Sequence, residues 1–318
     1  MPEHYPIDIT PPDISPYRVG STEVEYVHVL DSGQPGASVM VQALTHGNEF
    51  CGAIALDHLL KERIRPQQGR LTLAFANVAA YARFDFDDPN RSRYVDEDYN
   101  RVWADDALDG PRDSVELRRA RELRRFVDAA DYLLDLHSMH EPCRPIMVCA
   151  RSEKSVALSR RMGVPADLLL DTGHPAGLRM IERGPFSDSA SPRTAVLIEC
   201  GQHWEKNAVE VAIDTALRFL TVTGCVQESW ATPRLRLTPP AEQRLVRVTE
   251  AVVAKSMNFR FARPWKGLEI VAKAGTPVAY DDGKAWRTPY DDCVMVMPSM
   301  THLKPGNTTV RLGRYEAQ

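Results

Sequence analysis

The sequence predicts an α/β protein in which helices cover both faces of a mixed, mostly parallel sheet, followed by a small all-β domain at the C-terminal end. Strand-like and helix-like segments alternate through the first two-thirds of the chain, an order typical of a sheet with helices on both faces. Several of the expected strands are short apolar runs, as strands buried on both faces are. Helical periodicity then disappears beyond about residue 243, which indicates the all-β part.

Three helices and six strands are expected in the α/β part. The helix at 49–64 has apolar residues at helical spacing, and the amphipathic helix at 114–130 has Ser114 as a suitable N-cap. The long helix at 205–224 is expected to end at Gly224. The expected strands are residues 24–30, 37–44, 70–78, 131–137, 145–150 and 194–200.

A change in composition suggests the boundary between the two parts. Pro233, Pro239 and Pro240 fall in the stretch 231–243 and are typical of a linker. Short strands interrupted by Gly and Pro follow it. We therefore expect an α/β domain at residues 1–232 and a β-rich domain at 233–318, whose strands lie within 244–254, 269–280 and 291–299.

Composition restricts the possible partners. The net charge is -4 and the basic run at 118–125 has acidic neighbours, so it is expected to be a solvated helix face rather than a nucleic-acid site. The N-terminus has no signal-peptide core and no window is apolar enough to span a membrane, which favours a cytoplasmic protein without a membrane partner. The six scattered cysteines are expected to be free thiols.

The segment "THGNE" places His46 and Glu49 three residues apart where a strand gives way to a helix. A spacing of three puts both side chains on one side of a helical turn, and imidazole and carboxylate are zinc ligands. Taken alone this pair is more often a surface pair than a metal site. A third ligand could be His137, which ends the next apolar strand but one, because the carboxyl ends of parallel strands meet at one crevice.

Other residues compete for or support this site. His140 is an alternative third ligand, and His203 and Glu205 are weaker ones because they lead into a helix. Asp135 points to the same face of its strand as His137 and could orient it, although a separate buried charge pair is an equal alternative.

Two further features suggest chemistry on an anionic substrate. The irregular segment "SRYVDEDYNRVW" contains Arg93, Asn100 and Arg101, which could bind a carboxylate, although a solvated loop is the simpler interpretation. Glu199 follows the buried run "VLI" at the expected end of a strand. A carboxylate at the mouth of a crevice could act as a general base.

These four pieces, in this order, resemble the succinylglutamate desuccinylase/aspartoacylase family, whose fold is that of the zinc carboxypeptidases (M14 type). The resemblance rests on "HGNE" (46–49), "RYVDEDYNR" (93–101), "DLH" (135–137) and Glu199, and it extends over about residues 37–200. Each motif alone is weak, whereas the ordered set is specific. The β-rich end of the chain from about residue 235 is also similar to the C-terminal domain of the family.

The resemblance implies a hydrolase, a zinc-dependent deacylase that cleaves the linear amide of an N-acyl amino acid. His46, Glu49 and His137 would bind one Zn²⁺ per subunit, and Arg93 would steady the oxyanion. Asn100 and Arg101 would hold a substrate carboxylate, and Glu199 would be the general base and acid. A homo-oligomer is possible in this family. The alternatives are a zinc carboxypeptidase acting on peptides and a non-catalytic zinc or ligand-binding protein.

The sequence departs from the family pattern in two places. The Asn-Pro pair that many members carry before the loop is replaced here by Asn77-Val78. The region before Glu199 also lacks a convincing counterpart of the Arg and Tyr with which aspartoacylases read the second carboxylate of their substrate. Several residues remain open for that role, namely Arg179, Arg183, Arg193, Tyr280 and Tyr290.

Overall fold

The computed structural model describes residues 5–150, 152–171, 173, 176–301 and 303–316. Within these residues, eleven strands form one twisted sheet in the order β1-β3-β2-β4-β7-β5-β6-β8-β14-β13-β10. Three further strands form a second sheet in the order β12-β11-β9. The strands of the large sheet are β1 (Val27–Asp31), β2 (Ser38–Ala43), β3 (Arg70–Phe75), β4 (Tyr132–Met139), β5 (Ile146–Cys149), β6 (Asp167–Leu170), β7 (Thr194–Gln202), β8 (Arg244–Val253), β10 (Glu269–Val271), β13 (Cys293–Val296) and β14 (Thr308–Tyr315), and those of the small sheet are β9 (Arg260–Phe261), β11 (Pro277–Asp281) and β12 (Lys284–Arg287).

The large sheet is mixed, as predicted. Its centre is parallel, with β3, β2, β4 and β7 side by side in the same direction. Strand β5 runs antiparallel to β7 but parallel to β6, and β1 runs antiparallel to β3 at the edge. The C-terminal strands β8, β14, β13 and β10 are antiparallel to one another.

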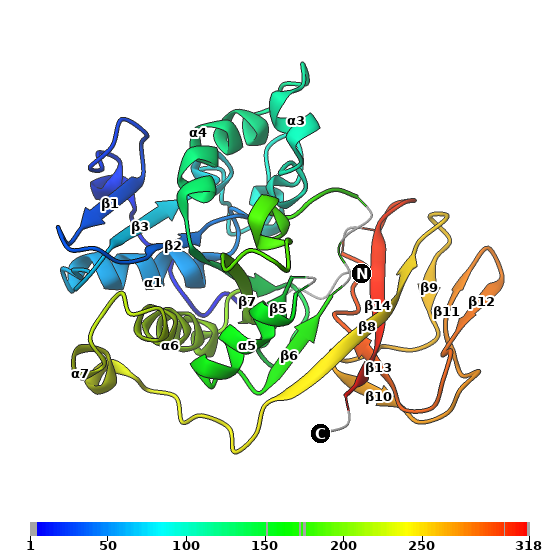
Figure 1. Cartoon of the computed structure of the whole chain (residues 1–318). Helices are drawn as coiled ribbons and strands as arrows, with labels where there is room; N and C mark the ends of the chain where they lie inside the picture. Colours follow the sequence, from blue (N-terminus) through cyan, green and yellow to red (C-terminus); the bar gives the residue numbers. More distant parts are fainter. Residues whose placement is uncertain (1–4, 151, 172, 174–175, 302, 317–318) are drawn as a thin grey trace.

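Helices cover both faces of the parallel part, which confirms the predicted fold class (Figure 1). On one face α1 (Phe50–Lys61), α5 (Glu153–Met162) and α6 (Lys206–Val222) enclose one apolar core with side chains of the sheet. On the other face α4 (Val115–Ala129) encloses a second core. The alternating apolar runs of the sequence therefore supply two cores, one on each side of the sheet.

Local signals explain where several helices begin and end. Ser114 caps α4 as predicted, because its side chain accepts a hydrogen bond from the Leu117 amide at 3.0 Å. Gly224 has a φ of +73° just after α6. The strand expected at 70–78 is shorter than predicted, since Asn77 caps the short helix α2 (Val78–Tyr81). The remaining short helices are α3 (Asp105–Asp109) and α7 (Glu228–Ala231).

The basic run at 118–125 is only partly the solvated face that the sequence suggested. Arg119 is buried and donates hydrogen bonds to the carbonyl oxygens of Glu25, Phe75 and Ala76. It therefore ties α4 to the ends of the neighbouring strands. The other arginines of the run pair with acidic side chains at the surface, for example Arg124 with Asp109.

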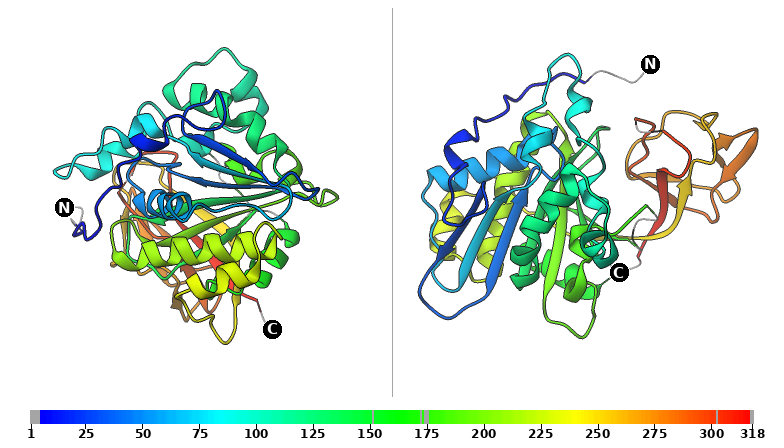
Figure 2. Two further views of the ribbon diagram at one scale, coloured as in Figure 1. Left: turned by 90° about the vertical axis from the view of Figure 1, so that its left-hand side faces the viewer. Right: turned by 90° about the horizontal axis from the view of Figure 1, so that it is seen from above.

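The C-terminal part continues the large sheet, because β8 pairs in parallel with β6 from Asp167↔Arg244 to Leu170↔Arg247. Figure 2 shows the small sheet standing away from the helical layers, at the far end of the strands β8 and β14. The domain boundary between residues 232 and 233 stays a prediction. Among the described residues, none of the helices combines the length and apolarity needed to cross a bilayer.

Candidate active site

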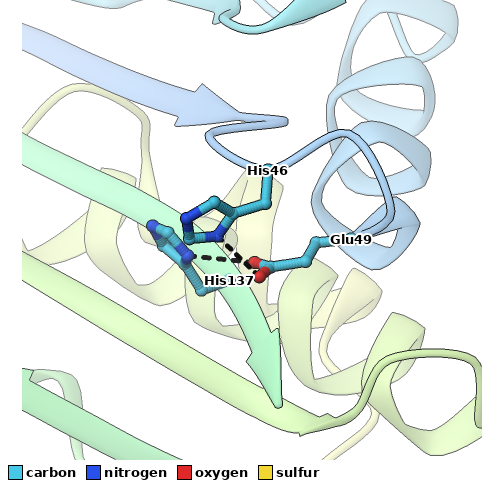
Figure 3. A group of neighbouring side chains, drawn as sticks. All are labelled: His46, Glu49 and His137. Atoms are coloured by element: carbon cyan, nitrogen blue, oxygen red, sulfur yellow. Dashed lines mark hydrogen bonds and ion pairs between the residues drawn. The ribbon is translucent and has the colours of Figure 1, made fainter. Parts of the chain in front are cut away.

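His46, Glu49 and His137 converge at the carboxyl end of the parallel strands (Figure 3). His46 lies in the turn after β2, Glu49 occupies the N-cap position of α1, and His137 lies on β4. His46 Nδ1 is 2.7 Å from Glu49 Oε1, and His137 Nδ1 is 2.9 Å from Glu49 Oε2. The Glu49 carboxylate thus faces both imidazoles, that of His46 three residues earlier and that of His137 on β4.

This donor set fits a zinc ion. One ligand atom from each of the three buried residues lies within 4.8 Å of the others. Two imidazole nitrogens and one carboxylate oxygen are the ligands of catalytic zinc sites that keep a fourth position for water. Burial works against ionisation of Glu49, but the two imidazoles outweigh it and hold the pKa of Glu49 well below its ordinary value. The carboxylate is therefore ionised, as metal binding requires.

A chain of hydrogen bonds orients His137 from behind. His137 Nε2 lies 2.8 Å from Asp135 Oδ2, and Thr45 donates its hydroxyl proton to Asp135 Oδ1 at 2.8 Å. Gln42 in turn donates to Thr45 Oγ1 at 2.9 Å. All four side chains are buried. With its Nε2 proton held by Asp135, His137 presents Nδ1 to the cluster, which is the supporting role proposed for Asp135 from its position on the strand.

Glu199 lies beside His137 on the adjacent strand. The two residues are register partners in the parallel pair β4–β7, and both lie inside their strands rather than at the ends, since β4 continues to Met139 and β7 to Gln202. Glu199 Oε2 is buried and, among the described atoms, has no hydrogen-bond partner. Burial raises the pKa of Glu199 to about 8. A carboxyl group with these properties can take up and release a proton near neutral pH.

Arg93 lies on the segment 93–101, called here the arginine loop. Its Nη1 is 3.3 Å from Glu49 Oε1, and its Nη2 is 3.3 Å from Asp98 Oδ2. Asp98 Oδ1 lies 3.0 Å from His46 Nε2. Arg93 Nη2 lies 2.9 Å from the same His46 Nε2, so this ring nitrogen faces both a carboxylate and a guanidinium. Asp98 and Arg93 together fix the ring of His46 from the side opposite Glu49, a contact that the sequence does not reveal.

Glu116 on α4 holds the arginine loop in place. Its Oε1 accepts hydrogen bonds from Asn77 Nδ2 at 3.0 Å and from the Val95 amide at 2.7 Å. Its Oε2 accepts from the Asp96 and Glu97 amides at 3.1 and 3.2 Å. Glu116 is fully buried, so four N–H groups take the place of water around its carboxylate. The loop is thus a folded part of the site rather than a solvated segment.

A cavity of about 430 Å³ adjoins His46 and His137, and the residues predicted to bind a substrate carboxylate line it. Asn100 and Arg101 line it together with Arg93 and Glu199. Asn100 is buried, and its Oδ1 accepts a hydrogen bond from the Met180 amide at 3.1 Å. Burial, aided by the neighbouring arginines, lowers the pKa of Arg101 to about 10 although Asp98 opposes this change. An anion bound in the cavity would offset the electrostatic repulsion between these arginines.

Two more arginines reach the same cavity from different parts of the chain. Arg179 is held by Asp171 at 2.8 Å and by Glu182 at 3.0 Å, and its buried Nη2 has no hydrogen-bond partner among the described atoms. Arg311 on β14 lies 3.3 Å from Asp171. Arg179 was one of the open candidates from the sequence. Arg311 is not among those candidates, although it lies in the buried middle of β14.

The other open candidates lie elsewhere. Arg183 pairs with Asp128 and Asp105, and Arg193 donates to the Asp128 carbonyl oxygen. Tyr280 and Tyr290 belong to the C-terminal part, where arginine side chains cover their rings. Within the described residues, none of these four lines the 430 Å³ cavity.

The competing ligand candidates are also not part of the group formed by His46, Glu49 and His137. His140 lies 2.9 Å from Thr301 Oγ1, and His203 lies 2.8 Å from Ser138 Oγ. The Glu205 carboxylate accepts a hydrogen bond from the Gln202 amide at 2.9 Å. His140 and His203 line a smaller neighbouring cavity, whereas Glu205 has a backbone-capping role.

Comparison with known proteins identifies a family. Residues 35–220 match the model of the succinylglutamate desuccinylase/aspartoacylase catalytic domain. The comparison with curated proteins gave no match. Among solved structures, succinylglutamate desuccinylase from Vibrio parahaemolyticus has 17% identity and a TM-score of 0.67, covering 89% of this chain and 82% of its own.

Two further structures show the same fold. Succinylglutamate desuccinylase from Vibrio cholerae has 15% identity and a TM-score of 0.68, with 92% of this chain and 86% of its own covered. The product-bound ectoine utilization protein EutE from Ruegeria pomeroyi has 15% identity and a TM-score of 0.62, with 91% and 89% covered. The similarity extends over both the α/β part and the C-terminal part.

Proposed function

Because the chain belongs to the succinylglutamate desuccinylase/aspartoacylase family, we propose that it is a zinc-dependent amidohydrolase that cleaves the amide bond of an N-acyl amino acid. The products would be a carboxylate and a free amino acid. One observation carries the proposal: the cluster of His46, Glu49 and His137 adjoins a cavity that also contains Glu199 and a group of arginines. Such a site combines metal ligands, a titratable carboxyl group and donors for an anionic substrate.

His46, Glu49 and His137 would hold the zinc ion. When bound, zinc acts as a Lewis acid and makes water a stronger nucleophile at neutral pH. Glu199 would take a proton from the attacking water molecule. It would then deliver that proton to the nitrogen of the leaving amine, so that the C–N bond breaks and a new C–O bond remains.

Arg93 and the arginines of the cavity would stabilise negative charge on the reacting carbonyl oxygen and on the substrate carboxylates. The Arg93 guanidinium lies beside Glu49 and could donate a hydrogen bond to the carbonyl oxygen as negative charge develops on it. Asn100 and Arg101 would hold the α-carboxylate of the amino acid. Arg179 Nη2, which has no hydrogen-bond partner among the described atoms, could donate a hydrogen bond to a further anionic group of the substrate.

A substrate panel with purified, zinc-loaded protein tests the proposal. N-acetyl- and N-succinyl-amino acids should release free amino acid, and the activity should disappear with chelator and return with Zn²⁺. The double variant His46→Ala, Glu49→Ala should be inactive. The matched double variant His58→Ala, Glu62→Ala, with the same residue types on and just after α1 outside the cluster, should stay active.

Two results would decide against the proposal. Full activity of the His46→Ala, Glu49→Ala protein would exclude the metal site. Release of C-terminal residues from peptides, with N-acyl amino acids left intact, would identify a carboxypeptidase instead.

A further inference from the structure

Two cavities meet at the metal cluster. They are the arginine-lined cavity of about 430 Å³ and a second cavity of about 170 Å³. Both are lined by His46, Arg93 and Glu199. An amide bond placed at this junction would therefore direct its two substituents into different cavities. The nature of each cavity then indicates which substituent it accepts.

The smaller cavity suits an uncharged group. Met139, Cys143 and Met297 form much of its wall, together with Pro298. Among the described residues that line it, Arg93 is the only arginine or lysine, whereas several carboxylates line it. Among the described lining residues, a substrate carboxylate would meet one arginine here and four in the larger cavity, so electrostatic attraction favours the larger cavity. The amino acid part belongs in the larger cavity and the acyl part in the smaller one.

The smaller cavity continues toward a third and larger one. Glu141, Pro298 and Ser299 line both the 170 Å³ cavity and a groove of about 980 Å³. The Glu141 carboxylate at this boundary is already engaged, since it accepts a hydrogen bond from Tyr5 Oη at 2.5 Å and lies 3.2 Å from His140 Nδ1. This groove is called here the acyl groove.

Apolar side chains from both parts of the chain form most of the acyl groove, and Glu141, Lys266, Ser299 and Thr301 also line it. Trp265 is fixed in its wall, because its Nε1 donates to the Val278 carbonyl oxygen at 2.8 Å and Arg263 covers its ring at 3.7 Å. Met300 is 37% exposed and is among the most exposed large apolar residues of the described chain. The apolar lining consists mainly of Tyr5, Pro142, Phe261, Trp265, Pro298 and Met300.

The volume of the smaller cavity limits the length of the acyl group that it can hold. At about 30 Å³ per water-sized group, the 170 Å³ cavity holds roughly six heavy atoms. A longer acyl group must pass Pro298 into the acyl groove. We propose, resting on the proposed deacylase function, that the substrate is an N-acyl amino acid whose acyl group is an unbranched alkanoyl chain of medium length. Hydrolysis adds one water molecule across the amide and releases the fatty acid and the amino acid.

A series of acyl groups on one amino acid tests this inference. N-acetyl-, N-butyryl-, N-hexanoyl-, N-octanoyl- and N-succinyl-L-glutamate present the same two carboxylates to the arginine-lined cavity. Burial of one methylene favours binding by roughly threefold to fourfold, so kcat/KM should rise at least tenfold from the acetyl to the octanoyl substrate. The succinyl substrate should be poorer than the butyryl one, which has the same chain length without the charge.

The outcomes separate this inference from the proposed function. A kcat/KM that is flat or falls beyond butyryl, or that is highest for succinyl, would overturn the inference and leave the deacylase proposal standing. Failure of the zinc-loaded protein to hydrolyse every member of the series would overturn both.

A charge placed in the groove gives an independent measurement. Met300→Glu should lower the ratio of octanoyl to acetyl kcat/KM about tenfold, because the carboxylate faces the apolar chain. Met257→Glu is the matched control, since Met257 is 63% exposed in the same C-terminal part and does not line the groove. It should leave the ratio unchanged. An equal ratio in both variants would show that the chain does not occupy the acyl groove.

Discussion

Glu116→Gln should loosen the arginine loop while leaving the rest of the fold intact. The Glu116 carboxylate accepts hydrogen bonds from Asn77 Nδ2 and from the amides of Val95, Asp96 and Glu97. Glutamine has nearly the same shape, but one of its two terminal atoms is an NH₂ donor. Whichever way the amide is turned, about two of the four N–H groups face a donor instead of an acceptor.

The structure sets the magnitude of this change. A buried group left without its partner costs about 1–3 kcal/mol, so two such groups give roughly 2–6 kcal/mol. Because the amides of the loop are only partly buried, water can reach them when the loop moves, and the lower part of that range applies. We expect a loss of about 2–3 kcal/mol in the free energy of unfolding. We also expect a fall of roughly tenfold to a hundredfold in kcat/KM, because Arg93 and Arg101 lose their positions.

Three measurements check this prediction. Urea unfolding gives the change in stability, and steady-state kinetics on an N-acyl amino acid gives the change in activity. Hydrogen exchange of the 95–97 amides reports on the loop itself and does not depend on the proposed reaction. Glu122→Gln is the control, since Glu122 lies on the same helix with its side chain 54% exposed and pairs with Arg119 at 2.8 Å. If both variants behave alike in all three measurements, Glu116 does not hold the loop.

Further predictions concern the proton and metal sites. Glu199→Gln should abolish turnover. In the metal-free folded protein the pKa of Glu199 is about 8, whereas its ordinary value is 4.5. Between these two pH values the unfolded chain loses a proton that the folded protein keeps. The free energy of unfolding of the wild type should therefore fall relative to that of Glu199→Gln as pH rises, by up to about 1.4 kcal/mol per pH unit. Urea unfolding across this pH range should show the two proteins converging below pH 4.5, and a constant difference would contradict the assignment. Asp135→Asn weakens the acceptor for His137 and should reduce zinc affinity about tenfold to a hundredfold in a chelator competition titration; unchanged affinity would remove Asp135 from the site. Removal of zinc should lower the melting temperature, since zinc at a hundred times its Kd stabilises by about 2.7 kcal/mol, and identical melting curves with and without zinc would argue against the metal.

Local sequence patterns were sufficient for the elements that carry the candidate site. The apolar runs before His46, His137 and Glu199 predict buried strands, and Ser114 predicts the start of α4. Strand ends were less certain, because a run of apolar residues does not reveal that β4 and β7 continue past their polar residues. The helix α5 and the strand β6 were not predicted from the sequence.

The roles of Glu116 and Arg311 could not be predicted from the sequence, because they depend on contacts between distant segments. Glu116 resembles any acidic residue in the first turn of a helix, where it would favour the positive end of the dipole. Only the fold shows that the arginine loop wraps its carboxylate. In the same way, Arg311 is brought to the cavity by the pairing of β14 with β8, more than a hundred residues after the motifs.

The parallel pairing of β6 with β8 has a consequence for how the protein can be divided. In a chain cut after residue 232, β6 would become an edge strand with a row of unpaired N–H and C=O groups, and such edges promote aggregation. The C-terminal part is thus less a removable appendage than the continuation of one hydrogen-bonded structure. We expect the two parts to unfold together in a single transition, so that a destabilising substitution at the far end of the sheet would also unfold the candidate site.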